Sequence, residues 1–262
     1  FFNHNSLENI LRWSSLDIST GVLLDYLHQK SLYPNSIAAT KEDLAISQAI
    51  AKEALLLAMQ TARKDFPKNI ATIKPNLTPL FEPILAGGSI LSDASRPGQS
   101  LLLLLDGLQP VGITTIILDQ NNLLPLLGVA ASQNNILPVQ VLESGAFLSV
   151  GTVVCPVAFT RYGASILKAR LSYENGAEAP VDLKMGSIET LPLANGETAK
   201  LTIQTARGVD VGFGPGRGGS IPVSGGALGV VFDGRGRPLD MPSDPARRRD
   251  LIKKWNWTLG GE

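Results

Sequence analysis

A glycine-rich stretch, residues 208–223 (GVDVGFGPGRGGSIPV), is the first candidate for a phosphate-binding loop. Gly214, Gly216 and Gly219 have the G-x-G-x-x-G spacing that lets backbone N–H groups approach a pyrophosphate. That function requires a strand before the glycines and a helix after them, because the helix N-terminus binds the anion. A plausible strand, VDVGF, precedes the glycines, but Pro222 and further glycines oppose a helix after them. We therefore predict a structural connection between β-strands, whose glycines serve positive-φ turns and close packing.

A second candidate is the short motif Gly87-Gly88-Ser89, which lies between a predicted buried strand and a predicted helix. Glycines at the carboxyl end of a parallel strand let a ligand approach the backbone closely. A plain strand-to-helix turn explains the same residues equally well. At the level of the residues alone, both interpretations stay open.

Few other residues have a pattern typical of catalysis. Asp119 and Asp233 each end an apolar run, where a carboxylate could act as a base, but capping and turn roles explain them equally well. Cys155 is the single cysteine and is expected to be buried and unreactive. No Cys/His spacing indicates zinc. A backbone nest that holds an anion near Arg217 is an alternative that stays open.

Basic residues crowd the C-terminal segment, at Arg247, Arg248, Arg249, Lys253 and Lys254. A solvated helix face explains them, and phosphate binding is the alternative. Ser243 is the expected N-cap of this helix. Trp255 and Trp257 are expected to dock the helix onto the body rather than to stack on bases.

The composition limits the class of protein. The 262 residues include 23 Lys and Arg and 23 Asp and Glu, and a net charge of zero argues against a dedicated nucleic-acid binder. Hydrophobic residues make up 44%, enough for a sizeable core. The strongest apolar run, residues 101–105, is far shorter than the roughly 20 residues that a membrane span needs, so we expect no span. A cytoplasmic location is compatible with the single cysteine.

Residues 1–144 have a pattern typical of helices followed by an α/β layer. Capping signals precede two helices, namely Asp17 or Ser19 before the first and Thr40 with Asp43 before the second. The expected helices cover residues 21–30, 40–66, 96–110 and 121–132, and the expected strands cover residues 81–86 and 113–119.

Residues 145–262 change to short strand-like runs separated by turns, and they end in a predicted docking helix. Asn175-Gly176 and Asn195-Gly196 are hairpin signals, because both turn residues accept positive φ. This half is therefore expected to be a β-rich module of antiparallel meanders with a C-terminal helix.

Three stretches resemble the glutamate mutase L family, also called MutL, which is unrelated to the mismatch-repair protein of that name. They are LAGGSILSDASRPGQSLLLLLDGLQPVGITTIILD, LLPLLGVAA and VGFGPGRGGSIPVSGGALGVVFDGRGRPLDMPSDPARRRDLIKKWNW. They look like the C-terminal portion of that family, and the N-terminal stretch of the chain resembles the family's middle region. The likeness thus covers nearly the whole chain, and the glycine-rich segment is its most specific element.

The resemblance implies a fold and a ligand. Members are similar to the actin, sugar-kinase and Hsp70 superfamily of ATPases, so residues 1–144 are expected to be the second lobe of such a fold. The expected ligand is ATP or ADP with Mg²⁺, and Gly87, Gly88 and Ser89 match the glycine pair that contacts the adenosine. An accessory or chaperone role beside adenosylcobalamin-dependent mutases is implied.

The sequence departs from the ATPase pattern at its start. The acidic strand and phosphate-binding hairpin of such ATPases have no counterpart here, because a helix-like segment follows LDISTG at residues 16–21. We therefore expect that a separate phosphate-binding lobe must complete the site, and that this chain alone does not hydrolyse ATP. A catalytically inactive structural or interaction module of a larger assembly is the alternative. An enzyme that uses Asp119 or Asp233 as a base ranks third.

Overall fold

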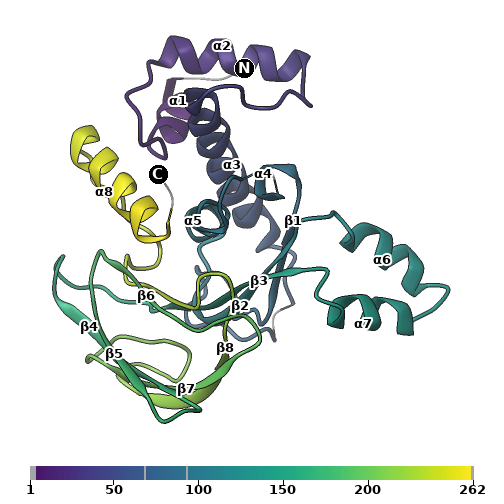
Figure 1. Cartoon of the computed structure of the whole chain (residues 1–262). Helices are drawn as coiled ribbons and strands as arrows, with labels where there is room; N and C mark the ends of the chain where they lie inside the picture. Colours follow the sequence, from purple (N-terminus) through teal and green to yellow (C-terminus); the bar gives the residue numbers. More distant parts are fainter. Residues whose placement is uncertain (1–3, 68, 93, 261–262) are drawn as a thin grey trace.

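The computed structural model describes residues 4–67, 69–92 and 94–260, which form an α/β protein with two sheets (Figure 1). The helices are α1 (His4–Leu11), α2 (Thr20–Leu32), α3 (Lys41–Ala62), α4 (Ser89–Ser92), α5 (Pro97–Gly107), α6 (Leu124–Ala131), α7 (Ile136–Glu143) and α8 (Pro245–Thr258). The strands are β1 (Ile84–Gly87), β2 (Gly112–Asp119), β3 (Leu148–Cys155), β4 (Ser165–Tyr173), β5 (Glu178–Lys184), β6 (Ile188–Leu191), β7 (Thr198–Thr205), β8 (Gly219–Ser224) and β9 (Val230–Asp233). The predicted α/β class is confirmed.

The larger sheet has five strands in the order β1-β2-β3-β9-β6. β1 and β2 are parallel and end together, because Gly87 lies opposite Asp119 in the register. β3 is antiparallel to β2, β9 is parallel to β3, and β6 is antiparallel to β9. Strands from both sides of residue 144 thus share one sheet, and the division into residues 1–144 and 145–262 stays a prediction.

Helix α5 lies at the centre of the core on one face of this sheet (Figure 1). It begins at Pro97, as predicted, and its five leucines at residues 101–105 are all buried. Helices α3 and α8 pack on either side of it. Gly98 of α5 is so close to the end of α8 that an added Cβ would lie 1.9 Å from the Leu259 carbonyl oxygen. The C-terminal helix is therefore docked on the body.

Two details of α8 differ from expectation. Its N-cap is Asp244, whose carboxylate accepts the N–H groups of Ala246 and Arg247, and not Ser243. Pro245 occupies the first helical position, where its missing N–H costs nothing, and this places the cap one residue later. Trp255 is 3% exposed and docks the helix as predicted, whereas Trp257 is 78% exposed and does not.

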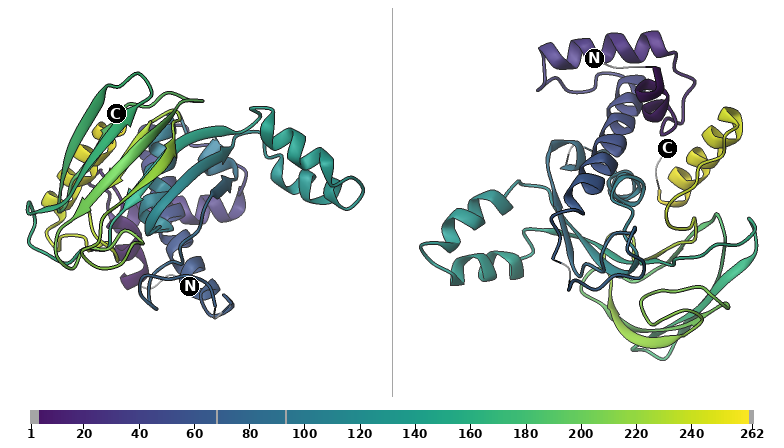
Figure 2. Two further views of the ribbon diagram at one scale, coloured as in Figure 1. Left: turned by 90° about the horizontal axis from the view of Figure 1, so that it is seen from below. Right: turned by 180° about the vertical axis from the view of Figure 1, so that it is seen from behind.

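The smaller sheet has the order β5-β4-β7-β8 and covers the other face of the larger one (Figure 2). Its inward side chains, such as Leu171 and Leu201, pack against Val154 and Phe232 from the larger sheet. The molecule thus has three layers, with helices, a mixed sheet and an antiparallel sheet.

The two hairpin signals have different outcomes. Asn175 and Gly176 join β4 to β5, which pair in antiparallel register, so that prediction is confirmed. Asn195 and Gly196 also form a turn, but β6 before it belongs to the larger sheet and β7 after it to the smaller one. The chain crosses between sheets at this turn instead of making a hairpin.

The glycine-rich segment connects β7 to β8 without a helix, as predicted. The expected strand at residues 209–213 is absent from the described structure, where Asp210 forms only an isolated bridge with Val157. Gly214 and Gly216 have positive φ, of 102° and 70°. Gly219 instead serves close packing, because an added Cβ would lie 2.9 Å from the Phe213 ring.

Helices α6 and α7 form a hairpin that projects from the body between β2 and β3 (Figures 1 and 2). Helix α6 agrees with prediction, and α7 was not expected. No residue in either helix is buried. Its helices therefore contribute no buried side chain to the core.

Candidate functional sites

The Gly87-Gly88-Ser89 motif lies where the parallel strands β1 and β2 end, as the sequence predicts. Gly88 has a φ of +114°, and an added Cβ would meet no atom within 4 Å. A side chain is thus opposed by the backbone conformation and not by crowding. The space beside Gly88 is therefore open. Ser89 follows as the first residue of the short helix α4.

Asp119 is the charged group nearest to this turn, since an added Cβ on Gly87 would lie 3.6 Å from its Oδ2. Asp119 is buried, and its two oxygens accept the N–H groups of Leu123 (2.9 Å) and Leu124 (2.7 Å). The carboxylate therefore stabilises the start of α6. This is the capping role that the sequence left open, and each carboxylate oxygen accepts one backbone N–H.

In the glycine-rich loop, the side-chain carboxylate of Asp210 takes the place that an anionic ligand would have. The carboxylate of Asp210 accepts the N–H groups of Gly212 (2.8 Å) and Gly214 (3.0 Å). These are the backbone donors that a phosphate would need. A protein carboxylate occupies them, which supports a structural role for the segment.

A buried network of ion pairs lies in the core between α3, α5 and the end of β9. Asp233, at the end of β9, accepts from Arg235 through both oxygens (2.8 and 2.9 Å) and from Arg237 (2.6 Å). Asp106 of α5 joins the network by pairing with Arg235 (2.6 Å) and with Lys52 of α3 (2.8 Å). The network thus ties α3 and α5 to the turn after β9.

Every guanidinium nitrogen of the two arginines has a partner. Arg237 also donates to the carbonyls of Pro110 and Gly236 and to the sulfur of Cys155, and the Arg235 guanidinium stacks on the Trp255 ring. Burial alone would raise the pKa of Asp233, but the charges of Arg235 and Arg237 outweigh it and hold that pKa well below its usual range. A permanently ionised, enclosed carboxylate is a structural group and not an available base.

Cys155 is buried at the end of β3, as predicted. Burial raises the pKa of its thiol to about 12, in spite of the nearby charge of Arg237. Because the thiolate is the reactive form, this cysteine is inert in the folded protein.

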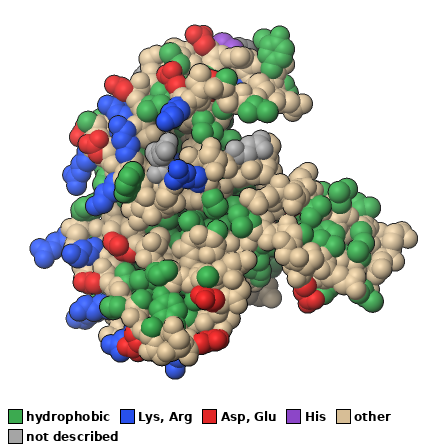
Figure 3. Space-filling model, viewed as in Figure 1, with side chains coloured by type: hydrophobic (Ala, Val, Ile, Leu, Met, Phe, Trp, Pro, Cys, Tyr) green, Lys and Arg blue, Asp and Glu red, His purple; other side chains and the backbone are tan. Residues whose placement is uncertain are grey.

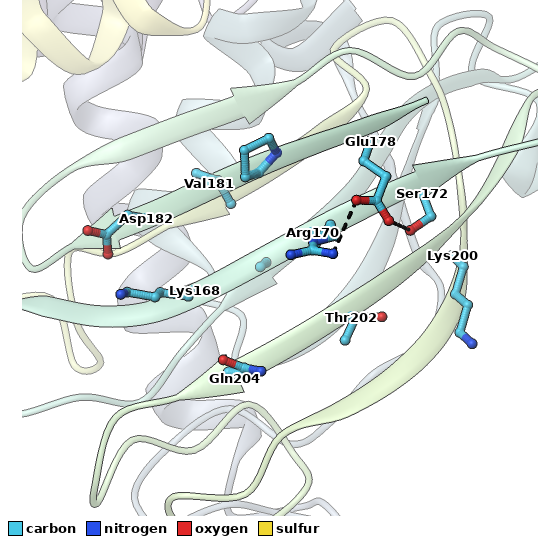
Figure 4. Close-up of a pocket in the computed structure, with 11 residues that line it drawn as sticks. Lys168, Arg170, Ser172, Glu178, Val181, Asp182, Lys200, Thr202 and Gln204 are labelled. Carbon is cyan, nitrogen blue, oxygen red and sulfur yellow. Dashed lines mark hydrogen bonds and ion pairs between the residues drawn. The ribbon is translucent and has the colours of Figure 1, made fainter. Parts of the chain in front are cut away.

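The outer face of the smaller sheet carries a shallow hollow of about 690 Å³ (Figure 4). Charges of both signs line it, including Lys168, Lys200 and Asp182, while Arg170 pairs with Glu178 at 3.1 Å. The side chains labelled in Figure 4 lie along the strands without converging on one point. Exposed pairs of this kind contribute little energy, and the hollow is a solvated sheet face.

The described ranges contain neither a metal-binding cluster nor a membrane-spanning helix. Residues 4–67, 69–92 and 94–260 contain no group of three or more His, Cys, Asp or Glu side chains placed to hold a metal ion. None of the helices in this part of the chain has the length and apolarity required to cross a membrane.

The comparisons with known proteins add one match. The model of a protein family described as MutL protein matches residues 2–145. No curated protein and no solved structure matches the chain. The glycine-rich segment that carries much of the resemblance lies outside the matched residues, whereas Gly87, Gly88 and Ser89 lie within them. The chain therefore belongs to the MutL family, in the glutamate mutase L sense and not the mismatch-repair one.

Proposed function

We propose that this chain is an accessory protein of a mutase such as glutamate mutase, and that Gly87-Gly88-Ser89 contacts the adenosine of a bound ATP or ADP. Family membership supports the association with a mutase. The open glycine turn at the joint end of β1 and β2 is the observation that carries the nucleotide site. Strand ends of this kind are where α/β sheets bind ligands.

The residues fit only part of a nucleotide site. Gly88 has open space beside it for a base or ribose, whereas both oxygens of Asp119 already accept backbone N–H groups at the start of α6. The described residues contain no carboxylate cluster for Mg²⁺. The second lobe of an actin-like ATPase would provide this kind of half-site. Phosphate and Mg²⁺ ligands would then come from a separate lobe, and nucleotide would act by closing the two lobes together.

Thermal unfolding with ADP tests the nucleotide site. ADP with Mg²⁺ is expected to raise the Tm of this chain when it is combined with a polypeptide that carries the phosphate-binding lobe. Gly88→Ala should remove most of that rise. Gly176→Ala is the matched control, because Gly176 also has positive φ (83°) and open space around its Cβ but lies in the distant β4–β5 turn. An equal ADP response in the two variants, or none in the wild-type pair, would contradict the nucleotide site.

The projecting α6–α7 hairpin favours a second function, as an interaction module. Its exposed apolar side chains include Leu126 (66%), Val129 (72%) and Ile136 (61%). Figure 3 shows hydrophobic side chains gathered on this projection. Isolated helices of this length are marginal in water, so a partner surface would stabilise them.

A second copy of this chain is the partner that the exposed hairpin suits best. Residues 120–147 contain a single charged side chain, Glu143, so two identical hairpins meet with little repulsion. The hairpin also matches the roughly 20–30 residues that each partner contributes to a standard interface. A two-fold dimer would bury the same patch on both subunits.

Light scattering after size exclusion tests the dimer. Val129→Glu should convert a dimer into a monomer, because it places a charge in the apolar patch. Ile37→Glu is the control, since Ile37 is 82% exposed but lies between α2 and α3. A wild-type monomer would contradict self-association and would leave a different polypeptide as the partner.

A further inference from the structure

A pocket of about 290 Å³ gathers three arginines from distant parts of the chain. Arg12 follows α1, Arg63 follows α3, and Arg248 lies in the first turns of α8. The connection between β9 and α8 completes the wall, with Pro238 and Pro242 among its residues. The pocket lies on helices and loops away from the Gly87-Gly88-Ser89 turn.

One nitrogen of each guanidinium donates a hydrogen bond to a protein oxygen. Arg12 Nη2 donates to Glu53 Oε2 (2.7 Å), Arg63 Nη1 to the Asn76 carbonyl (2.6 Å), and Arg248 Nη1 to the Pro242 carbonyl (3.1 Å). An arginine has five N–H donors in a rigid fork. The anchors therefore fix three guanidinium groups while most of their donors stay available.

The Nε atoms of these arginines are buried without a hydrogen-bond partner. They account for three of the five such atoms found among the described residues. A buried donor without an acceptor costs free energy, and the three arginines that carry these donors all line this one pocket. An oxyanion has several acceptor oxygens and can accept hydrogen bonds from more than one guanidinium group at the same time.

The charged residues around the pocket are mainly positive, as the binding of an anion requires. Among the described residues, no carboxylate forms an ion pair with Arg63 or Arg248, and Glu53 is shared between Arg12 and Trp13. Asp240, which is exposed, is the acidic residue that lines the pocket, and Glu53 lies outside the lining. Burial lowers the pKa of Arg248, and the charges of Arg249 and Arg12 lower it further, while Asp244 acts in the opposite direction. Positive charge thus accumulates beside Arg248.

We propose that Arg12, Arg63 and Arg248 form a binding site for a small oxyanion, with the phosphate group as the best match. Guanidinium groups bind phosphate through paired N–H donors, and the pocket is close to the lower end of the size of small-molecule sites. The bound anion would join the N-terminal helices to the start of α8. Binding does not depend on a nucleotide at Gly88.

Calorimetric titration with inorganic phosphate at constant ionic strength tests the site. Wild-type protein should bind phosphate, and Arg63→Gln and Arg248→Gln should each weaken binding by about tenfold or more. Arg247→Gln is the matched control, because it removes the same charge from the same helix at a residue outside the pocket lining. Its affinity should stay within about twofold of wild type.

A conservative variant and a second anion complete the experiment. Arg63→Lys keeps the charge but loses the fork, so it should recover only part of the lost affinity. Malonate in place of phosphate distinguishes a carboxylate site from a phosphate site, and tighter malonate binding would assign the pocket to carboxylates. No measurable phosphate or malonate binding, or equal weakening in Arg247→Gln and Arg248→Gln, would overturn the proposal. Circular dichroism of each variant confirms that loss of binding is not loss of fold.

Discussion

The protein contains two groups of arginines that differ in the partners of their guanidinium groups. In the core, Arg235 and Arg237 have a partner at every guanidinium nitrogen, with Asp233 at the centre. In the pocket between α1, α3 and α8, each of three arginines has one anchored nitrogen and an unpartnered buried Nε. The hydrogen-bonding capacity of the core guanidinium groups is thus satisfied within the protein, whereas that of the pocket guanidinium groups is not.

This difference separates structural arginines from arginines that are available to a ligand. A buried charge is tolerated only when it is paired and its hydrogen bonds are made, so the core network must carry its own carboxylates. The pocket arginines are only half-buried, so water can hydrate the exposed parts of their guanidinium groups. Substitution of a residue should therefore lower the free energy of unfolding much more in the core network than in the pocket.

The largest effect is expected for Asp233→Asn. It leaves Arg235 and Arg237 buried with too little negative charge, so the free energy of unfolding should fall by about 3–5 kcal/mol. Urea denaturation measures this loss. Asp250→Asn is the control on exposed α8 and should change the stability by less than about 0.5 kcal/mol. Similar losses in the two variants would mean that the core network is not a closed unit.

The core network also predicts a pH dependence through Cys155. Its pKa is 9.0 in the reference state and about 12 in the fold, so the folded thiol keeps its proton while the unfolded one loses it. The stabilising contribution is complete below pH 9 and is lost as the pH rises toward 12, by about 1.4 kcal/mol per pH unit. Urea denaturation at pH 9 and 10.5 measures the slope. Cys155→Ala should have a shallower slope over this range, and an unchanged slope would contradict the assignment.

Glu53 pairs with Arg12, so it is the carboxylate that partly offsets the positive charge of the pocket arginines. Glu53→Gln keeps an acceptor for Trp13 and Arg12 but removes the charge. Stability should fall by about 1 kcal/mol, while phosphate binding should tighten by about fivefold. Denaturation and calorimetry of the same sample give both values. Weaker phosphate binding would show that Glu53 acts mainly by positioning Arg12.

Much of the fold follows from local patterns in the sequence. Pro97 at the start of α5, the Thr40–Asp43 capping box of α3 and the Asn175–Gly176 hairpin are all as predicted, since each depends on residues close together in the chain. The Asn195–Gly196 turn was assigned to a hairpin because its local chemistry is the same. Only the pairing of β6 with β9 reveals the crossing between sheets, and that contact is distant in sequence.

The candidate sites depend even more on distant contacts. Arg248 could be singled out within a basic helix, but nothing near Arg12 or Arg63 in the sequence connects either residue to it. Likewise, Lys52 and Glu53 interrupt an apolar helix pattern, and their burial follows from partners on α5 and beside α1. The position of Gly88 at a strand end was predictable, because a strand and its turn are local.

The smallest effect on stability is expected for the double variant Arg63→Gln with Arg248→Gln. In the absence of phosphate, each substitution removes one hydrogen bond to a backbone carbonyl. Loss of Arg248 also removes a positive charge that is repelled by Arg249 and Arg12. These contributions oppose each other, so the free energy of unfolding should change by less than about 1 kcal/mol. Arg237→Gln is the comparison, and it should cost several times more because Arg237 is fully enclosed. Addition of phosphate should then stabilise the wild-type protein but not the double variant, because only the native pocket binds the anion. A large loss of stability without phosphate would instead make the pocket arginines part of the structural framework, like those of the core.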